Sequence, residues 1–160
     1  MVAIRAAESK SDWVTARGLF EEYAASLGFD LSFQDFDREV ASLPGDYASP
    51  RGVILLALDV HAAADGSAAA GCVALRPLAG ETCEMKRLYV RPSHRGTGLG
   101  KRLADAILAE ARARHYRRMR LDTVPGMEAA IGLYRALGFR EIEPYRANPI
   151  PGALFMEREL

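Results

Sequence analysis

The sequence predicts a mixed α/β fold in which helices flank a central, mostly antiparallel sheet. Three observations support this prediction. Apolar runs bounded by turn residues alternate with stretches of helical periodicity, three strand-like runs follow one another in mid-chain, and two later helices each stand between strands. Consecutive strands favour antiparallel pairing, whereas helical crossovers favour a locally parallel pair. The 160 residues contain no linker and no internal repeat, so we expect one domain spanning 1–160.

The N-terminal part is expected to form a strand at 2–6 and then a helix. Ser11 is a candidate N-cap, because Trp13, Phe20 and other apolar residues recur after it at helical spacing. Gly28 is a plausible residue to end this helix, because glycine adopts the left-handed conformation that often follows a last helical turn.

A second, shorter helix is expected from Ser32 to about Leu43, where Pro44-Gly45 would end it. The next element is a continuous apolar run at 52–59, which is typical of a strand covered on both faces. Asp65-Gly66 marks a turn before the following strand.

The remaining elements alternate between strands and helices. Period-two or buried apolar patterns predict the strands, and apolar residues three and four apart predict the helices. In chain order they are strands at 71–77 and 83–90, a helix over 99–111, a strand at 119–124, a helix over 128–137, and strands at 139–143 and 153–159.

Composition excludes several classes of protein. Lys plus Arg equals Asp plus Glu at 21 each, so the chain lacks the basic excess of a nucleic-acid binder. No apolar run approaches the ~20 residues that a membrane span needs, and the first residues lack the layout of a signal peptide. We therefore expect a cytoplasmic protein. Cys72 and Cys83 lie in apolar, strand-like stretches and are expected to be buried, unreactive thiols.

Positive charge is nevertheless concentrated locally. Residues 86–120 contain eleven Lys or Arg and two acids, which favours a small phosphate-bearing ligand or simply a solvated helix face. The three histidines, His61, His94 and His115, lack the spacing of a metal site, so no metal is expected.

The most informative segment is a glycine-rich turn between a strand and a helix, Arg95-Gly-Thr-Gly-Leu-Gly-Lys101. Glycines let backbone N–H groups approach an anion, and the helix N-terminus adds the positive end of its dipole. The turn therefore indicates a pyrophosphate site, or otherwise a flexible connection. A Walker A loop is excluded, because Arg102 stands where a Ser or Thr should follow Lys101. A dinucleotide fingerprint lacks its third glycine, although Asp122 lies where a ribose-binding acid could follow.

The turn matches the pattern Arg-x-x-Gly-x-Gly, formed by Arg95, Gly98 and Gly100. The strand Glu84-Met-Lys-Arg-Leu-Tyr-Val90 precedes it, and the segment Ala130-Ile-Gly-Leu-Tyr-Arg-Ala-Leu-Gly-Phe139 follows it. Together these segments resemble the GCN5-related N-acetyltransferases, closely over about 83–145. The resemblance implies a sheet with a splayed parallel pair of strands and acetyl-CoA as the acyl donor. An Asn often found in the family is Met127 here, which puts pantetheine contacts from that position in doubt.

The resemblance also implies roles for particular residues. Backbone amides of the central strand would hold the pantetheine and the thioester oxygen, and the glycine turn would hold the pyrophosphate. Tyr134 would donate a proton to the departing sulfur, although it also lies on an apolar helix stripe and could be a core aromatic. The expected cofactor-binding residues are Leu88, Tyr89, Val90, Arg95, Gly96, Thr97, Gly98, Leu99, Gly100 and Lys101.

Glu84 occupies the strand position where several family members place a base that acts through water. By strand alternation Glu84 is expected to share a face with Lys86, Leu88 and Val90, and it could equally form a salt bridge with Lys86 or Arg87. These two roles stay open at this point.

The resemblance implies an amine acceptor, either a small molecule or a peptide, and no nucleic-acid or membrane partner. The acceptor pocket would be framed by 27–32 and 144–151, with Tyr145, Arg146 and Asn148 as wall residues. Alternatives are a CoA-binding module without turnover and acylation of a hydroxyl or thioester-linked acceptor. The oligomeric state stays open, a homodimer included.

Overall fold

The computed structural model describes residues 1–28, 31, 35–62, 68–124 and 126–160. It contains one seven-stranded sheet with the strand order β1-β2-β3-β4-β5-β7-β6. The strands are β1 (Val2–Ala6), β2 (Val53–Asp59), β3 (Ala69–Ala79), β4 (Thr82–Val90), β5 (Arg118–Thr123), β6 (Arg140–Ile142) and β7 (Leu154–Glu159). The β4–β5 pair is parallel and the other neighbouring pairs are antiparallel, which confirms the predicted mixed sheet.

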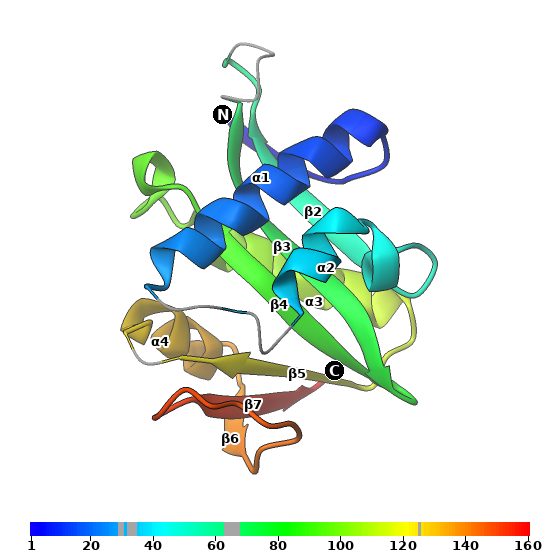
Figure 1. Ribbon diagram of the computed structural model, residues 1–160, viewed down its shortest axis with the longest axis vertical. Helices are drawn as coiled ribbons and strands as arrows, with labels where there is room; N and C mark the ends of the chain where they lie inside the picture. The colour runs from blue at the N-terminus through cyan, green and yellow to red at the C-terminus, as the bar shows by residue number, and fades with distance from the viewer. Residues whose placement is uncertain (29–30, 32–34, 63–67, 125) are drawn as a thin grey trace.

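Helices cover both faces of the sheet. The α-helices are α1 (Lys10–Ser26), α2 (Phe36–Ala41), α3 (Leu99–Ala113) and α4 (Glu128–Ala136), and short 3₁₀ helices lie at Gly45–Tyr47 and Pro92–His94. In Figure 1, α1 and α2 cross the front of the sheet and α3 lies behind it. One apolar cluster fills the space under α1 and α2, and a second fills the space under α3 and α4. Strand β2 is buried on both faces, as its apolar run predicted.

Local chemistry explains how α1 begins. Its N-cap is Ser9 rather than the predicted Ser11, because Ser9 and Asp12 form a reciprocal capping box. Arg5 in β1 holds Asp12 through two hydrogen bonds of 2.8 Å, and this pair ties the start of the helix to the edge strand. The Arg5 hydrogen bonds keep the pKa of the Asp12 carboxyl below its ordinary range.

Other predicted boundaries shift by a few residues. The second helix is shorter than predicted, because it begins at Phe36 and gives way to a 3₁₀ turn after Pro44. Its predicted start at Ser32, and the predicted turn at 65–66, lie outside the described residues. The strand expected at 139–143 is confined to Arg140–Ile142.

Candidate functional site

Strand β4 contains a β-bulge. Cys72 of β3 pairs with Tyr89 and Ala74 pairs with Lys86, so one residue of β3, Val73, opposes two of β4, Arg87 and Leu88. Arg87 lies in the bulge with φ 60°, a conformation uncommon for a residue with a side chain. The extra residue reverses the alternation of the strand, because Met85 before the bulge and Leu88 after it pack on the same apolar cluster. The expectation that Glu84 shares a face with Leu88 and Val90 is therefore wrong.

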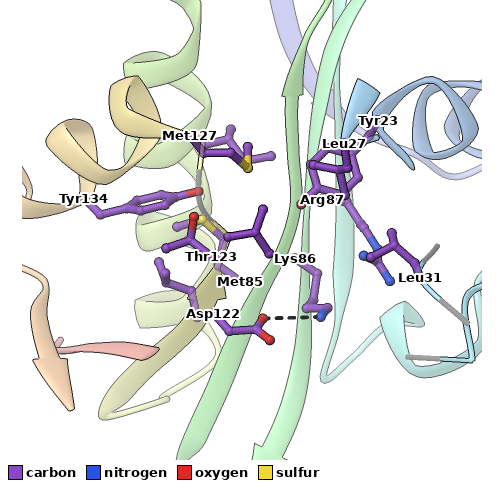
Figure 2. Close-up of a pocket in the computed structure, with 13 residues that line it drawn as sticks. Tyr23, Leu27, Leu31, Met85, Lys86, Arg87, Asp122, Thr123, Met127 and Tyr134 are labelled. Atoms are coloured by element: carbon purple, nitrogen blue, oxygen red, sulfur yellow. Dashed lines mark ion pairs between the residues drawn. The ribbon is translucent and has the colours of Figure 1, made fainter. Parts of the chain in front are cut away.

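Strands β4 and β5 diverge after a short parallel pairing. They pair over Thr82–Glu84 and Arg118–Arg120, and their later residues separate. The opening between them, here called the slot, has a volume of about 30 Å³. Figure 2 shows Tyr134, Thr123 and Met127 on one side of the slot and Tyr23, Leu27 and Leu31 on the other.

A larger cleft of about 580 Å³ lies along the end of β4, the glycine turn and the start of α4. We call it the glycine-turn cleft. Tyr23, Leu27, Leu88 and Met127 line both the cleft and the slot, so the two spaces adjoin. The volume lies within the ~300–1,000 Å³ typical of small-molecule sites.

The glycine turn leaves its backbone open to the cleft. Gly96 and Gly98 have φ values of 77° and 82°, and a Cβ built at either would meet no atom within 4 Å. Gly98 is the N-cap of α3, and no side chain caps this 15-residue helix. The first N–H groups of the helix therefore lack a capping side chain and can bind an anion. The cleft fits the pyrophosphate and pantetheine of a CoA molecule in volume and in donor chemistry.

The predicted cofactor residues divide into two groups. Eight line the glycine-turn cleft, namely Leu88, Tyr89, Val90, Arg95, Gly96, Gly98, Leu99 and Gly100. Thr97 and Lys101 are not among the lining residues. The Thr97 hydroxyl donates to the His94 carbonyl at 2.6 Å, and Lys101 pairs with Asp105 at 2.7 Å on the exposed side of α3. Arg95 braces the turn, since its Nε donates to the Val90 carbonyl at 3.0 Å.

Tyr134 reaches the slot from α4, with its hydroxyl directed into the space between the strands (Figure 2). Its ring packs edge-on against Phe139, with centroids 5.8 Å apart. The side chain is buried, and this burial raises its pKa above the ordinary value. The phenol therefore stays protonated at neutral pH, as a proton donor must.

Glu84 lies outside the linings of the slot and the cleft, fully buried. Its Oε1 accepts from Arg76 at 2.9 Å, and its Oε2 accepts from Tyr145 at 2.7 Å and pairs with Arg146 at 2.5 Å. The sequence offered Lys86 or Arg87 as possible partners and suggested none of these three, and the charge of Lys86 also acts on the Glu84 carboxyl. Burial alone would raise the pKa of Glu84, but the charges of Lys86, Arg76 and Arg146 outweigh it and hold the pKa below its ordinary value.

The two basic residues that follow Glu84 have other acidic partners. Lys86 lies 3.7 Å from Asp122 across the diverging strands, and Arg87 binds Glu39 of α2 at 2.9 Å. Burial lowers the pKa of Lys86 to about 8, even though Glu84 and Asp122 oppose the shift. Lys86, Arg87 and Asp122 all line the slot, so its floor is polar where its walls are apolar.

Of the predicted acceptor-wall residues of the C-terminal segment, one contacts this polar floor and two contact Glu84, which precedes it on β4. Tyr145 and Arg146 reach Glu84, and the Asn148 amide donates to Asp122 at 3.4 Å. Leu27 and Leu31 of the segment after α1 line the slot, whereas residues 29, 30 and 32 lie outside the described part of the chain. Both segments predicted to frame an acceptor thus contribute to one region.

Sequence reasoning missed Arg76, Glu39 and Thr123. Arg76 stands directly opposite Glu84 in the β3–β4 register, so a correct hairpin register would have suggested the pair. Glu39 carries no local signal, because its partner Arg87 is 48 positions away. The buried Thr123 hydroxyl lines the slot without a hydrogen-bond partner among the described residues.

Two further findings concern the described residues alone. No group of three or more His, Cys, Asp or Glu side chains is placed to hold a metal ion. None of the described helices combines the length and hydropathy needed to cross a bilayer.

The fold and the site define an α/β protein with a glycine-turn cleft that adjoins a tyrosine-lined slot between diverging strands. Comparison with known proteins agrees. The family model "Acetyltransferase (GNAT) family" matches residues 17–139. A Schizosaccharomyces pombe protein named as an uncharacterized N-acetyltransferase is 39% identical, covering 99% of this chain and 95% of its own length.

A Dictyostelium discoideum protein with the same kind of name is 29% identical, covering 82% of this chain and 86% of its own length. The solved structure of a GNAT-family acetyltransferase from Staphylococcus aureus has a TM-score of 0.78 at 19% identity, covers 99% of each chain, and supports the fold. The chain belongs to the GNAT family of acetyltransferases. The fold of this family implies use of an acyl-CoA, and its enzymes act on an amine acceptor.

Proposed function

We propose that this protein transfers an acetyl group from acetyl-CoA to a primary amine of a small molecule or peptide, by direct attack in a ternary complex. The observation that carries the proposal is the continuity of the glycine-turn cleft with the slot, where the tyrosine of the family signature points. A donor held by its pyrophosphate at the turn would extend through the cleft, and its thioester would meet an amine from the polar floor beside Tyr134.

The residues that would hold the donor follow from the lining of the cleft. The N–H groups at the start of α3 would bind the pyrophosphate, and the backbone of Leu88, Tyr89 and Val90, which line the cleft, would bind the pantetheine. Met127 lines the cleft by its side chain and offers van der Waals contact in place of an amide. Bound acetyl-CoA would supply an activated thioester carbonyl and a thiolate leaving group.

The chain itself would handle charge and protons. A β4 backbone N–H beyond the bulge would stabilise the oxyanion, an effect worth ~3 kcal/mol of barrier in comparable sites. Tyr134 would donate its proton to the leaving sulfur as negative charge develops there, because its hydroxyl is protonated at neutral pH. The tyrosinate left behind is a stronger base than a thiolate and would regain a proton from solvent.

The proton of the incoming amine needs an acceptor, and Glu84 is the candidate from the sequence. Its three partners and lowered pKa favour a second role, in which Glu84 holds Arg76, Tyr145 and Arg146 in place. Solvent in the slot would then take the amine proton.

The test is turnover of acetyl-CoA with a panel of amines, followed by thiol release and by mass spectrometry of the products. An active protein adds 42 mass units per amine, a value fixed by replacing one hydrogen with an acetyl group. Tight CoA binding without turnover of any amine, alcohol or thiol would instead identify a CoA-binding module that lacks catalysis.

A further inference from the structure

A third cavity lies beside the polar floor, under α2 and the 3₁₀ turn that follows it. Its volume is about 540 Å³, and its wall includes Arg76, Arg146 and Tyr47. We call it the arginine cavity. Arg87 of the slot binds Glu39 of the cavity wall at 2.9 Å, so this ion pair links the linings of the two spaces.

The inner wall of the cavity carries more positive than negative charge. Arg76 and Arg146 share one carboxylate, that of Glu84, while Glu39 lies 3.9 Å from Arg76 and is held by Arg87. Among the described residues, Arg146 makes its ion pair through Nη2, which leaves its other N–H groups for a ligand. The side chains of Arg76 and Arg146 are only about one-fifth exposed, at 21% and 23%, so bulk water solvates their positive charges incompletely.

A second observation points to the same place. Tyr47 lines the cavity with a side chain that is 3% exposed. Its buried hydroxyl makes no hydrogen bond of ordinary geometry to another described residue, although the Glu39 carboxylate is close enough to act on it. A buried hydroxyl without a well-formed hydrogen bond is destabilising, and a ligand oxygen would relieve that cost. Burial raises the pKa of Tyr47 above its ordinary value, so the group is present as a donor.

The outer rim differs from the inner wall. Arg38, Asp35 and Asp46 line the cavity as solvent-exposed residues of mixed charge. A charged ligand group at the rim would stay solvated, so its ion pairs there would add little binding free energy. Selectivity is therefore expected from the inner wall, where two guanidinium groups and one hydroxyl all donate.

From this arrangement we infer that the acceptor is an amine that also carries a carboxylate, which Arg76, Arg146 and Tyr47 bind while the amine lies in the slot. The inference rests on the proposed function. Arg76 stands opposite Glu84, two residues along β4 from Lys86 in the slot, a spacing of about 7 Å. The acceptor is accordingly compact and resembles a short amino acid, because its amine and carboxylate must span that distance.

The test compares acceptors matched in length and different in terminal charge. 4-Aminobutyrate, its carboxamide and 1,4-diaminobutane present a carboxylate, a neutral amide and an ammonium at the same position, and α- and β-amino acids vary the span. We expect kcat/KM for at least one amino acid to exceed that of its carboxamide by about tenfold or more, because charge-assisted hydrogen bonds discriminate to that extent. Preference for the carboxamide or the diamine, with turnover present, would overturn the inference and leave the proposed function standing.

Substitutions in the arginine cavity test whether it causes the preference for an acceptor with a carboxylate. Arg146→Gln should lower kcat/KM for the amino acid about tenfold more than it lowers kcat/KM for the carboxamide. Arg146→Lys should recover part of the loss, and Tyr47→Phe should lower kcat/KM for the amino acid severalfold. Arg118→Gln is the matched control, because Arg118 also pairs with a buried glutamate, Glu157, but lies outside the cavity. Equal losses with both kinds of acceptor would show a structural role and refute the inference.

Binding measured without chemistry separates the two proposals. Calorimetric titration of the amino acids into wild type and Arg146→Gln, with CoA present, reports the cavity alone. Carboxylate binding that Arg146→Gln weakens, in a protein that acetylates none of the amines, would support the cavity and refute the transferase. Absence of both binding and turnover for every amino acid would refute the inference.

Discussion

The glycine-turn cleft and the arginine cavity lie on the same protein but are encoded in different ways. The cleft is built mainly from one continuous stretch, from Leu88 to Gly100, together with the start of α4. The cavity and the polar floor are built from α2, β3, β4 and the C-terminal segment, whose residues meet only after folding. On our proposal, the cleft would bind the acyl donor that the family shares, and the cavity would bind an acceptor particular to this chain.

This difference follows from the kind of contact in each region. A backbone anion site needs glycine at fixed positions, because Gly98 at φ 82° adopts a conformation that other residues rarely enter. Side-chain ion pairs impose no such local requirement, so Arg76 or Glu39 looks like any solvated charge until its partner is known. The proposed donor site can therefore be predicted from a short sequence motif, whereas the proposed acceptor site can be identified only from the structure.

The largest expected effect is on CoA binding at the glycine turn. Gly98→Asp would place a carboxylate at the N-cap of α3, where the pyrophosphate is proposed to bind. Like-charge contact costs several kcal/mol, so we expect the Kd for CoA, measured by calorimetry, to rise at least about 100-fold.

Two controls isolate the effect of the charge. Gly98→Asn adds a similar side chain without charge, and Asn tolerates a positive φ better than most residues, so its effect on the Kd should be smaller. Gly80→Asp changes another positive-φ glycine, at φ 55°, in the β3–β4 turn, and reports strain alone. A folded Gly98→Asp that binds CoA like wild type would contradict the assignment of the turn.

The next effect concerns the junction of the two regions. Tyr134→Phe keeps the edge-on packing against Phe139 and removes the hydroxyl from the slot. We expect kcat to fall about 100-fold with the Kd for CoA unchanged, as for removal of a general acid. Tyr116→Phe is the matched control, because it removes another buried phenol hydroxyl, bonded to the Arg51 carbonyl at 2.8 Å, away from the cleft. Equal kcat values for wild type and Tyr134→Phe, with chemistry rate-limiting, would make Tyr134 a core aromatic.

Much of the fold and part of the site could be predicted from the sequence. Apolar periodicity gave the order of elements, and the capping error at α1 was two residues, because both Ser9 and Ser11 are plausible caps. The reversal of side-chain direction after Lys86 could not be predicted from alternation, since the bulge at Arg87 depends on its pairing with β3. The partners of Glu84 were missed for the same reason, because Arg146 becomes a neighbour only when the C-terminal segment folds over β4.

A third, smaller effect distinguishes the two roles of Glu84. Glu84→Gln removes the shared carboxylate of Arg76 and Arg146, and we expect a loss of about 2–3 kcal/mol in unfolding free energy at pH 7, below the ~3–5 for fully buried pairs. The folded pKa of Glu84 is lowered, so this stabilisation is present above the unfolded pKa and is lost as the pH falls through the folded pKa. Chemical denaturation at a series of pH values should show a constant difference between the two proteins above the ordinary Glu pKa of 4.5 and a shrinking difference as the pH falls further.

The pH dependence of activity completes that test. As a scaffold residue, Glu84 should give Glu84→Gln the same fractional loss of kcat/KM from pH 7 to pH 10. As a base, it should give a loss that shrinks toward pH 10, where an amine of pKa about 10 deprotonates unaided. Glu157→Gln is the matched control, because Glu157 is also buried and pairs with three arginines but lies outside the slot. A loss of kcat/KM that is specific to Glu84→Gln and shrinks with rising pH would instead assign Glu84 the role of the base.

The smallest expected effect sharpens the boundary of the donor site. Lys101 belongs to the glycine motif, yet its ammonium lies 2.7 Å from Asp105 on an exposed helix face, with 65% of the side chain exposed. Because an exposed charge is screened by water and salt, Lys101→Met should raise the Kd for CoA only about threefold at low salt, and less at 0.5 M salt. Arg95→Met should cost more at both salt concentrations, because Arg95 lines the cleft and its Nε braces the turn through the Val90 carbonyl. Titrations of both variants at the two salt concentrations would measure this difference. A loss for Lys101→Met that exceeds that of Arg95→Met and persists at high salt would place Lys101 on the ligand and extend the anion site beyond the described lining.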